Sequence, residues 1–180
     1  PSSSETATIL WYGIHGGENA PYGMLDLLNI QEHLSRLRRD YPFRLVVVSN
    51  SRTKYKKYIK PLPFETEYYE WGYTPFRNIL RHASVNILPI TKNPFTICKS
   101  NNRLALALYE GVPSVADEIP SYKELAPFCV LNDWERGLRL YLSNKNIGKG
   151  HVEGARAYIE RTFTITQIAD QWQAQLSRFL

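Results

Sequence analysis

Cysteine is scarce in this chain: among 180 residues there are two, Cys98 and Cys129, and no Cys-x-x-Cys pair. Two cysteines cannot form a disulfide framework, and they offer no zinc-binding spacing with histidine. Long apolar runs are missing too, because no stretch approaches the roughly 20 residues that a membrane span needs. The sequence therefore predicts a domain of a reducing compartment, which we expect to be cytoplasmic, with no metal.

A signal peptide is also missing, and so are internal repeats and low-complexity tracts. The chain begins at Pro1, and Pro1-Ser2-Ser3-Ser4 reads as a linker. The hydrophobic fraction of 43% and the charged fraction of 22% are ordinary for a globular fold. We expect a linker over residues 1–7 and one domain over residues 8–180, cut from a longer protein.

Acidic residues are in the minority: the chain has 22 Lys and Arg residues and 17 Asp and Glu residues, which gives a net charge of +5. Such a surplus favours an anionic partner: nucleic acid, an acidic membrane surface or a phosphate-bearing ligand. The basic cluster Lys54, Lys56, Lys57 and Lys60 usually means a solvated surface. No recognition-helix pattern or RNA-binding aromatic motif is present, so we do not expect nucleic acid.

Strand-like and helix-like segments alternate along the chain. The run RLVVVS at 44–49 has the continuous apolar character of a strand covered on both faces. Helices are expected to open at Thr74-Pro75, at Ser100 as a capping hydroxyl, and at Thr164. The expected strands are 9–13, 44–49, 64–71, 84–90, 112–117 and 128–131. The expected helices are 24–39, 74–82, 100–110, 121–126, 133–143, 152–161 and 165–179. This rhythm predicts an α/β fold with a doubly wound and mostly parallel sheet.

Ligands of such sheets bind beyond the carboxyl ends of the strands, so the loops there are the candidate site. The loop after the first strand contains Gly16 and Gly17, which allow a sharp turn or a close approach of backbone to ligand. The glycine spacing is not Gly-x-Gly-x-x-Gly, which argues against a nicotinamide or flavin cofactor.

The segment Lys99-Ser100-Asn101-Asn102-Arg103 is the strongest local signal. It sets two cations and small polar side chains at the start of a helix, where free backbone N–H groups attract anions. The plain alternative is a serine cap with solvated neighbours.

Further candidates follow the second and third strands. Asn50 and Ser51 offer an amide and a hydroxyl to a phosphate, and the alternative is a simple turn. Trp71 and Tyr73 are flat aromatics that could stack on a base, although core packing is equally common for such residues.

These residues resemble a known pattern. Lys99-Ser100-x-Asn102-Arg103, then Gly111-Val112-Pro113-Ser114-Val115-Ala116, then 119–125 (IPSYKEL) look like the donor-binding half of GT-B glycosyltransferases, closest to the glycosyl transferases group 1 (family 4-like) pattern. The similarity runs over about residues 8–179. It implies the C-terminal, Rossmann-like half of a GT-B fold.

The resemblance implies a nucleotide-diphosphate sugar as donor and metal-independent transfer of the sugar to an acceptor, in cell-surface polysaccharide or glycoconjugate synthesis. It places Gly16 and Gly17 near the diphosphate and Trp71 or Tyr73 beside the base. Ser100, Asn101 and Asn102 would meet the phosphates or the sugar, with Lys99 and Arg103 beside them. The acceptor and the catalytic base would belong to a missing N-terminal domain, so this fragment alone would be inactive, and no catalytic residue is assigned.

Two features depart from the pattern. Cys98 and Leu106 stand where the Glu-x7-Glu motif has its two glutamates, and the glycine loop has no Arg/Lys pair. These losses keep an alternative open, a non-catalytic nucleotide-binding or interaction module of the same fold, whose basic face makes a peripheral contact with an anionic membrane.

Overall fold

The chain folds around a six-stranded sheet whose neighbouring strands are all parallel. The computed structural model describes residues 6–179, without the side chains of Tyr73 and Thr74. Most of the predicted linker, residues 1–5, therefore lies outside the described part. The strands are β1 (Ala7–Tyr12), β2 (Phe43–Ser49), β3 (Thr66–Glu70), β4 (Val85–Leu88), β5 (Ser114–Ala116) and β6 (Val130–Leu131). Each overlaps its predicted range, which confirms the predicted doubly wound sheet.

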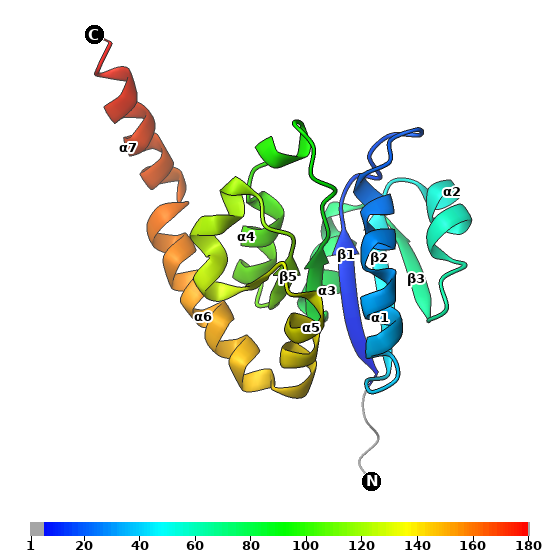
Figure 1. Ribbon diagram of the computed structural model, residues 1–180. Coiled ribbons are helices and arrows are strands. Elements are labelled where there is room, and N and C mark those ends of the chain that lie inside the picture. Colours follow the sequence, from blue (N-terminus) through cyan, green and yellow to red (C-terminus); the bar gives the residue numbers. More distant parts are fainter. Residues whose placement is uncertain (1–5, 180) are drawn as a thin grey trace.

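The strand order β3-β2-β1-β4-β5-β6 places β1 in the middle of the sheet (Figure 1). Along the chain, β2 and β3 are added on one side of β1, out to the β3 edge. The next strands, β4, β5 and β6, are added on the other side of β1, out to the β6 edge. The loops that follow β1 and β4 therefore flank the point where the winding reverses. In open α/β sheets this switch point is where a crevice forms at the carboxyl edge.

One face of the sheet packs against η1 (Gly23–Ile30), α1 (Gln31–Leu37) and α5 (Trp134–Ser143). Gly137 lets α5 approach closely, because a Cβ there would lie 2.9 Å from methyl groups of Val115 and Val130.

The other face packs mainly against α3 (Tyr73–Arg81) and α4 (Asn102–Tyr109), with η4 (Pro120–Phe128) and α6 (Lys145–Thr162) beyond them. A short helical segment links β2 to β3: α2 (Arg52–Lys54) continues as the π-helical turn η2 (Tyr55–Ile59). The remaining elements are η3 (Thr96–Cys98) and α7 (Ile165–Leu176). Both faces of the sheet are thus covered, as its apolar strands require.

Several helix starts differ from the prediction. The segment 24–39 is a 3-10 helix that passes into α1, and α3 begins at Tyr73 after Gly72 rather than with Thr74 as its cap. The α4 helix begins at Asn102, with Lys99 still extended before it, so the expected cap at Ser100 was wrong. Helix α6 begins at Lys145, earlier than expected, because the side chain of Asn144 accepts hydrogen bonds from two backbone amides of its first turn.

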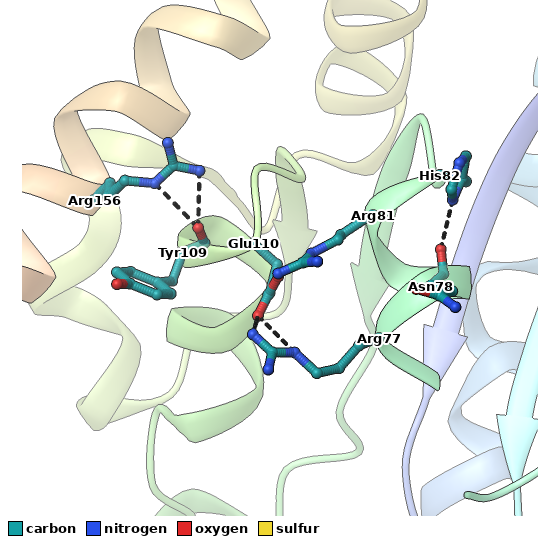
Figure 2. A network of polar contacts seen from close by, with 7 residues as sticks. All are labelled: Arg77, Asn78, Arg81, His82, Tyr109, Glu110 and Arg156. Carbon is teal, nitrogen blue, oxygen red and sulfur yellow. Dashed lines mark hydrogen bonds and ion pairs between the residues drawn. The ribbon is translucent and has the colours of Figure 1, made fainter. Parts of the chain in front are cut away.

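Glu110, at the end of α4, ties α4 to α3 (Figure 2). Its side chain is 3% exposed and accepts hydrogen bonds from Arg77 and from Nε of Arg81, the latter at 2.5 Å. Burial opposes ionisation, but the hydrogen bonds from Arg81 and Arg77 outweigh it and lower the pKa of Glu110. On the same face, Arg156 of α6 donates to the carbonyl oxygen of Tyr109 from Nε and Nη2, at 3.2 and 3.0 Å. The three helices are thereby fixed to one another.

The last helix, α7, projects away from the rest of the molecule (Figure 1). The side chain of Thr164 accepts a hydrogen bond from the Gln167 amide, which confirms the predicted cap. None of the α7 residues is buried, and Ile165 and Trp172 are 90% and 65% exposed. The predicted apolar face of this helix is therefore only partly covered within residues 6–179. None of the helices described combines the length and the hydropathy that crossing a membrane requires.

Candidate functional site

Two adjoining cavities open at the carboxyl edge of the sheet, beside the switch point. The first has a volume of about 520 Å³, and we call it the Trp71 cavity; it is lined by Tyr12, Gly13, Ile14, Asn50, Trp71, Asn102, Arg103 and Leu106. The second, of about 380 Å³, is the Lys99 cavity; it is lined by Ile14, Gly16, Tyr22, Phe95, Lys99 and Arg103. Because Ile14 and Arg103 line both, the two cavities form one elongated site.

Arg103 is held at the junction of the cavities by β1. Its Nη1 donates to the carbonyl oxygen of Tyr12 at 3.1 Å, and the Tyr12 hydroxyl donates to the carbonyl oxygen of Arg103 at 2.5 Å. Burial raises the pKa of this tyrosine, so the hydroxyl keeps its proton for that hydrogen bond. This reciprocal pair fixes the first turn of α4 against the end of the central strand.

Lys99 brings a second cation to the Lys99 cavity. Its Nζ lies 5.7 Å from the ring centroid of Tyr22 and 5.8 Å from that of Phe95. Burial, and then the nearby Arg103 guanidinium, lower the pKa of Lys99. Across residues 6–179 no carboxylate forms a salt bridge with Lys99 or Arg103. Two neighbouring cations without a salt bridge favour a bound anion.

The glycine loop after β1 takes a shape that needs glycine. Gly16 and Gly17 both have φ +93°, a region that residues with a side chain rarely adopt. A Cβ on Gly16 would also collide with the carbonyl oxygen of Tyr22. The sharp turn, one of the two roles that the sequence left open for these glycines, is therefore present in the structure.

Lys54 holds this loop from the side of α2. Its side chain is buried, and Nζ donates to the carbonyl oxygens of His15, Gly17 and Ala20 at 3.0, 2.9 and 2.9 Å. The C=O and N–H of a trans peptide point in opposite directions. Because the His15 carbonyl faces Lys54, the N–H of Gly16 points away from that cation. Lys54 therefore sets which way the loop amides point.

Asp26 joins the glycine loop to the loop after β4. This buried carboxylate accepts hydrogen bonds from the Gly23 amide at 2.9 Å and from the amide and hydroxyl of Thr91 at 3.1 and 2.6 Å. Three donors compensate the burial of its charge. The two loops that carry Tyr22 and Lys99 are thereby fixed relative to each other.

The structure brings together part of the predicted site. Six of the predicted residues line the cavities: Gly16, Asn50, Trp71, Lys99, Asn102 and Arg103. Gly17, Ser51, Ser100 and Asn101 are not among the lining residues, and the side chain of Tyr73 lies outside the described part.

Three of the predicted ligand residues have partners within the protein. The side-chain oxygen of Asn50 accepts from the His15 amide at 3.1 Å, and the Ser51 hydroxyl caps α2 by accepting from the Lys54 amide. The side-chain Nδ2 of Asn101 donates to Oε1 of Glu124 at 2.7 Å. These side chains shape the loops around the cavities.

Sequence reasoning missed Tyr22, Phe95 and Lys54. Tyr22 and Phe95 stand in loops that follow strands, so their positions agreed with the carboxyl-edge rule, but neither aromatic was singled out. Grouping Lys54 with a solvated basic cluster was wrong, because Lys54 is 6% exposed while Lys56 and its neighbour Lys57 are exposed. Within residues 6–179, no group of three or more His, Cys, Asp or Glu side chains is arranged to hold a metal ion.

No protein-family model matches the chain, and no curated protein matches it. Several solved structures do match the chain. HepE from Anabaena, in complex with UDP and glucose, has a TM-score of 0.68 at 13% identity, over 96% of this chain and 48% of HepE. TarM has a TM-score of 0.66 at 16% identity, over 97% of this chain and 36% of TarM.

A third structure that matches is the catalytic domain of cholesterol-α-glucosyltransferase from Helicobacter pylori, with a TM-score of 0.62 at 14% identity, over 88% of this chain and all of that domain. These likenesses confirm the predicted fold, the Rossmann-like half of GT-B structures. The chain spans about a third to a half of the length of TarM and HepE.

Proposed function

We propose that this chain binds a nucleotide-diphosphate sugar along the two cavities and is the donor-binding half of a glycosyltransferase. One observation carries the proposal: Lys99 and Arg103, which form no salt bridge in residues 6–179, converge beside the glycine loop where the two cavities meet. A diphosphate there would match two cations. The nucleoside would extend into the Trp71 cavity, where Trp71 offers an exposed aromatic face.

In this proposal the reaction transfers the sugar to an acceptor hydroxyl. The bond between the anomeric carbon and the diphosphate oxygen breaks, a bond from that carbon to the acceptor oxygen forms, and the acceptor proton goes to a base. The leaving diphosphate gains negative charge, which Lys99 and Arg103 would stabilise without a metal. The acceptor site and the base would lie outside this chain, which would make the chain inactive by itself. This agrees with the share of the two longer proteins that the chain covers, 36% of TarM and 48% of HepE.

Two features support the donor class. HepE, a structure of the same fold, is described in complex with UDP and glucose, and MnaA from S. aureus, with a TM-score of 0.53, is described with UDP. The cavities lie at the switch point of the sheet, where α/β folds bind nucleotides. The class of product, a cell-surface polysaccharide or glycoconjugate, is part of the proposal.

Calorimetric titration tests this proposal directly. UDP, GDP and ADP are titrated into the chain together with their glucose conjugates, and we expect at least one of the nucleotides to bind. Lys99→Gln and Arg103→Gln should each weaken binding about tenfold, the loss of one charge-assisted contact. Lys92→Gln is the matched control, because Lys92 is exposed in the same loop and lines neither cavity. No heat of binding with any of these ligands would refute the proposal.

A further inference from the structure

We infer that Tyr22 and Phe95 form the platform on which the sugar of the donor stacks, and that this sugar is a neutral hexose. The inference rests on the proposed function and adds the place and the character of the transferred group. It comes from the geometry of one aromatic pair and from the residues that surround it.

The two rings stand side by side on separate loops at the same end of the sheet. Their centroids lie 5.9 Å apart with an interplanar angle of 35°, and both rings line the Lys99 cavity. Phe95 is 65% exposed. The pair therefore presents apolar ring surface to a ligand beside a cationic group, a surface suited to the C–H face of a pyranose.

The loop that presents Phe95 is rigid. The side-chain oxygen of Asn93 accepts hydrogen bonds from the amides of Phe95 and Thr96, each at 2.9 Å. The Thr96 hydroxyl donates to the carbonyl oxygen of Thr91 at 2.6 Å, and Asp26 holds Thr91 in turn. An exposed phenylalanine at the tip of so constrained a turn is preorganised, so a ligand that stacks on it loses little ordering entropy.

The position of the diphosphate decides which group reaches this platform. A nucleotide-diphosphate sugar extends in two directions from its diphosphate, which would lie at the junction marked by Arg103. The Trp71 cavity, of about 520 Å³, suits the larger group, a base with its ribose. The Lys99 cavity, of about 380 Å³, suits a single hexose ring. The sugar is therefore the part that meets Tyr22 and Phe95.

The lining of the Lys99 cavity also constrains the sugar. Its six lining residues include two cations, two aromatics, Ile14 and Gly16, and no carboxylate. Carboxylates would accept hydrogen bonds from sugar hydroxyls, so recognition here depends on the apolar face of the ring. The two cations are occupied by the diphosphate in this arrangement, which leaves no partner in the lining for a second acidic group. A neutral hexose fits this set.

The test measures what the sugar adds to the affinity of the nucleotide. The nucleotide diphosphate that binds the wild-type chain is compared with its glucose conjugate by calorimetry, and the ratio of the two dissociation constants is the sugar increment. Phe95→Ala and Tyr22→Leu should each reduce this increment twofold to about tenfold, the range of one aromatic contact. The affinity of each variant for the nucleotide diphosphate alone is the reference for its increment, because the two rings also lie 5.7 and 5.8 Å from the ammonium of Lys99.

Four further measurements make the result decisive. Ile97→Ala is the matched control, because Ile97 is 39% exposed in the same loop and does not line the cavity. Phe95→Tyr should preserve the increment, because the ring is kept. A glucuronic acid conjugate should bind more weakly than the glucose conjugate. Thermal unfolding verifies that each variant is folded.

The outcomes separate the two proposals. If a nucleotide diphosphate binds but the sugar increment is unchanged in both Phe95→Ala and Tyr22→Leu, the platform is refuted and the proposed function stands. Preference for the glucuronic acid conjugate would refute the neutral hexose. If no nucleotide diphosphate binds, the proposed function fails and the platform fails with it.

Discussion

The ammonium group of Lys54 donates a 2.9 Å hydrogen bond to the carbonyl oxygen of Gly17, and this bond joins α2 to the glycine loop. Two more carbonyl oxygens of that loop share the same donor. One buried side chain thus binds three carbonyls of the same loop. The direction of the loop amides therefore depends on a residue that lines neither cavity.

Replacing Lys54 should therefore damage both the loop and binding. We expect Lys54→Met to lower the free energy of unfolding by about 1–3 kcal/mol, because three loop carbonyls lose their donor. The affinity for a nucleotide diphosphate should fall by about tenfold or more, the effect of misplaced charge-assisted contacts. Urea unfolding and calorimetry measure the two effects.

Lys57→Met is the control for that change. Lys57 is exposed on the same segment, and its replacement by methionine removes the same charge. Lys54→Arg should restore more binding than Lys54→Met, since it keeps a cationic donor. Equal affinity in Lys54→Met and wild type would contradict the role of Lys54 in shaping the loop.

Trp71→Ala should separate recognition of the base from recognition of phosphate. Trp71 is 48% exposed, lines the Trp71 cavity and packs on Phe76 at 4.6 Å between ring centroids. If a base stacks on it, the variant loses about 1–3 kcal/mol of binding to nucleotide diphosphates. Affinity for inorganic pyrophosphate should not change. Trp172→Ala, on exposed α7, should alter neither, and a loss of both ligands in Trp71→Ala would argue against base stacking.

Glu110 should make stability depend on acid pH. Its pKa is lowered in the folded state, so its contribution is complete above the unfolded glutamate pKa of about 4.3 and disappears as the pH falls through the lower folded value. Glu110→Gln should cost about 1–2 kcal/mol near neutral pH, since both arginine partners are partly exposed. Urea unfolding from pH 7 to pH 3 should show the wild type and this variant converging.

The exposed residue Glu160 provides the comparison on the same face of the sheet. Glu160→Gln should follow the wild-type curve at every pH. A gap between wild type and Glu110→Gln that does not narrow between pH 5 and pH 3 would show that the charge of the carboxylate is not the source of the difference.

Two glycines should respond to alanine in opposite ways. Gly137→Ala would bring a methyl group within 2.9 Å of Val115 and Val130, and overpacking of this kind costs about 1–3 kcal/mol. Gly150 lies inside α6, where an added methyl group would meet none of the atoms of residues 6–179 within 4 Å. Gly150→Ala should therefore stabilise the chain by up to about 1 kcal/mol. Thermal unfolding distinguishes the two, and destabilisation by both would contradict the packing described.

The sheet was predictable because its strands are marked by local sequence. The run at 44–49 is continuously apolar at its centre, as in a strand covered on both faces. The position of the loops at the carboxyl edge could then be predicted from the order of the strands and helices. Lys99 and Arg103 could be singled out because two cations at a helix start form a local pattern. Lys54 could not, because its local sequence is that of an exposed basic helix and its burial depends on contacts with residues 15–20.

The aromatic platform could not be predicted from the sequence for a related reason. Tyr22 and Phe95 are far apart in the chain, and hydrogen bonds from Thr91 to Asp26 and from Asn29 to Thr91 help to bring their loops together. The start of α4 was misplaced because Ser100 is a good capping residue by type. In the fold, the backbone is still extended at Lys99 and the helix begins after Asn101.

The central place of β1 has a consequence for how the molecule assembles. Its residues pair with 43–48 on one side and with 85–86 on the other, so its ladders close only after long stretches of chain have been brought back to it. Pairings so remote in sequence slow the search for the native topology. Until β4 arrives, one flank of β1 carries unpaired N–H and C=O groups, and this open edge is where a partly assembled chain would be most prone to aggregate.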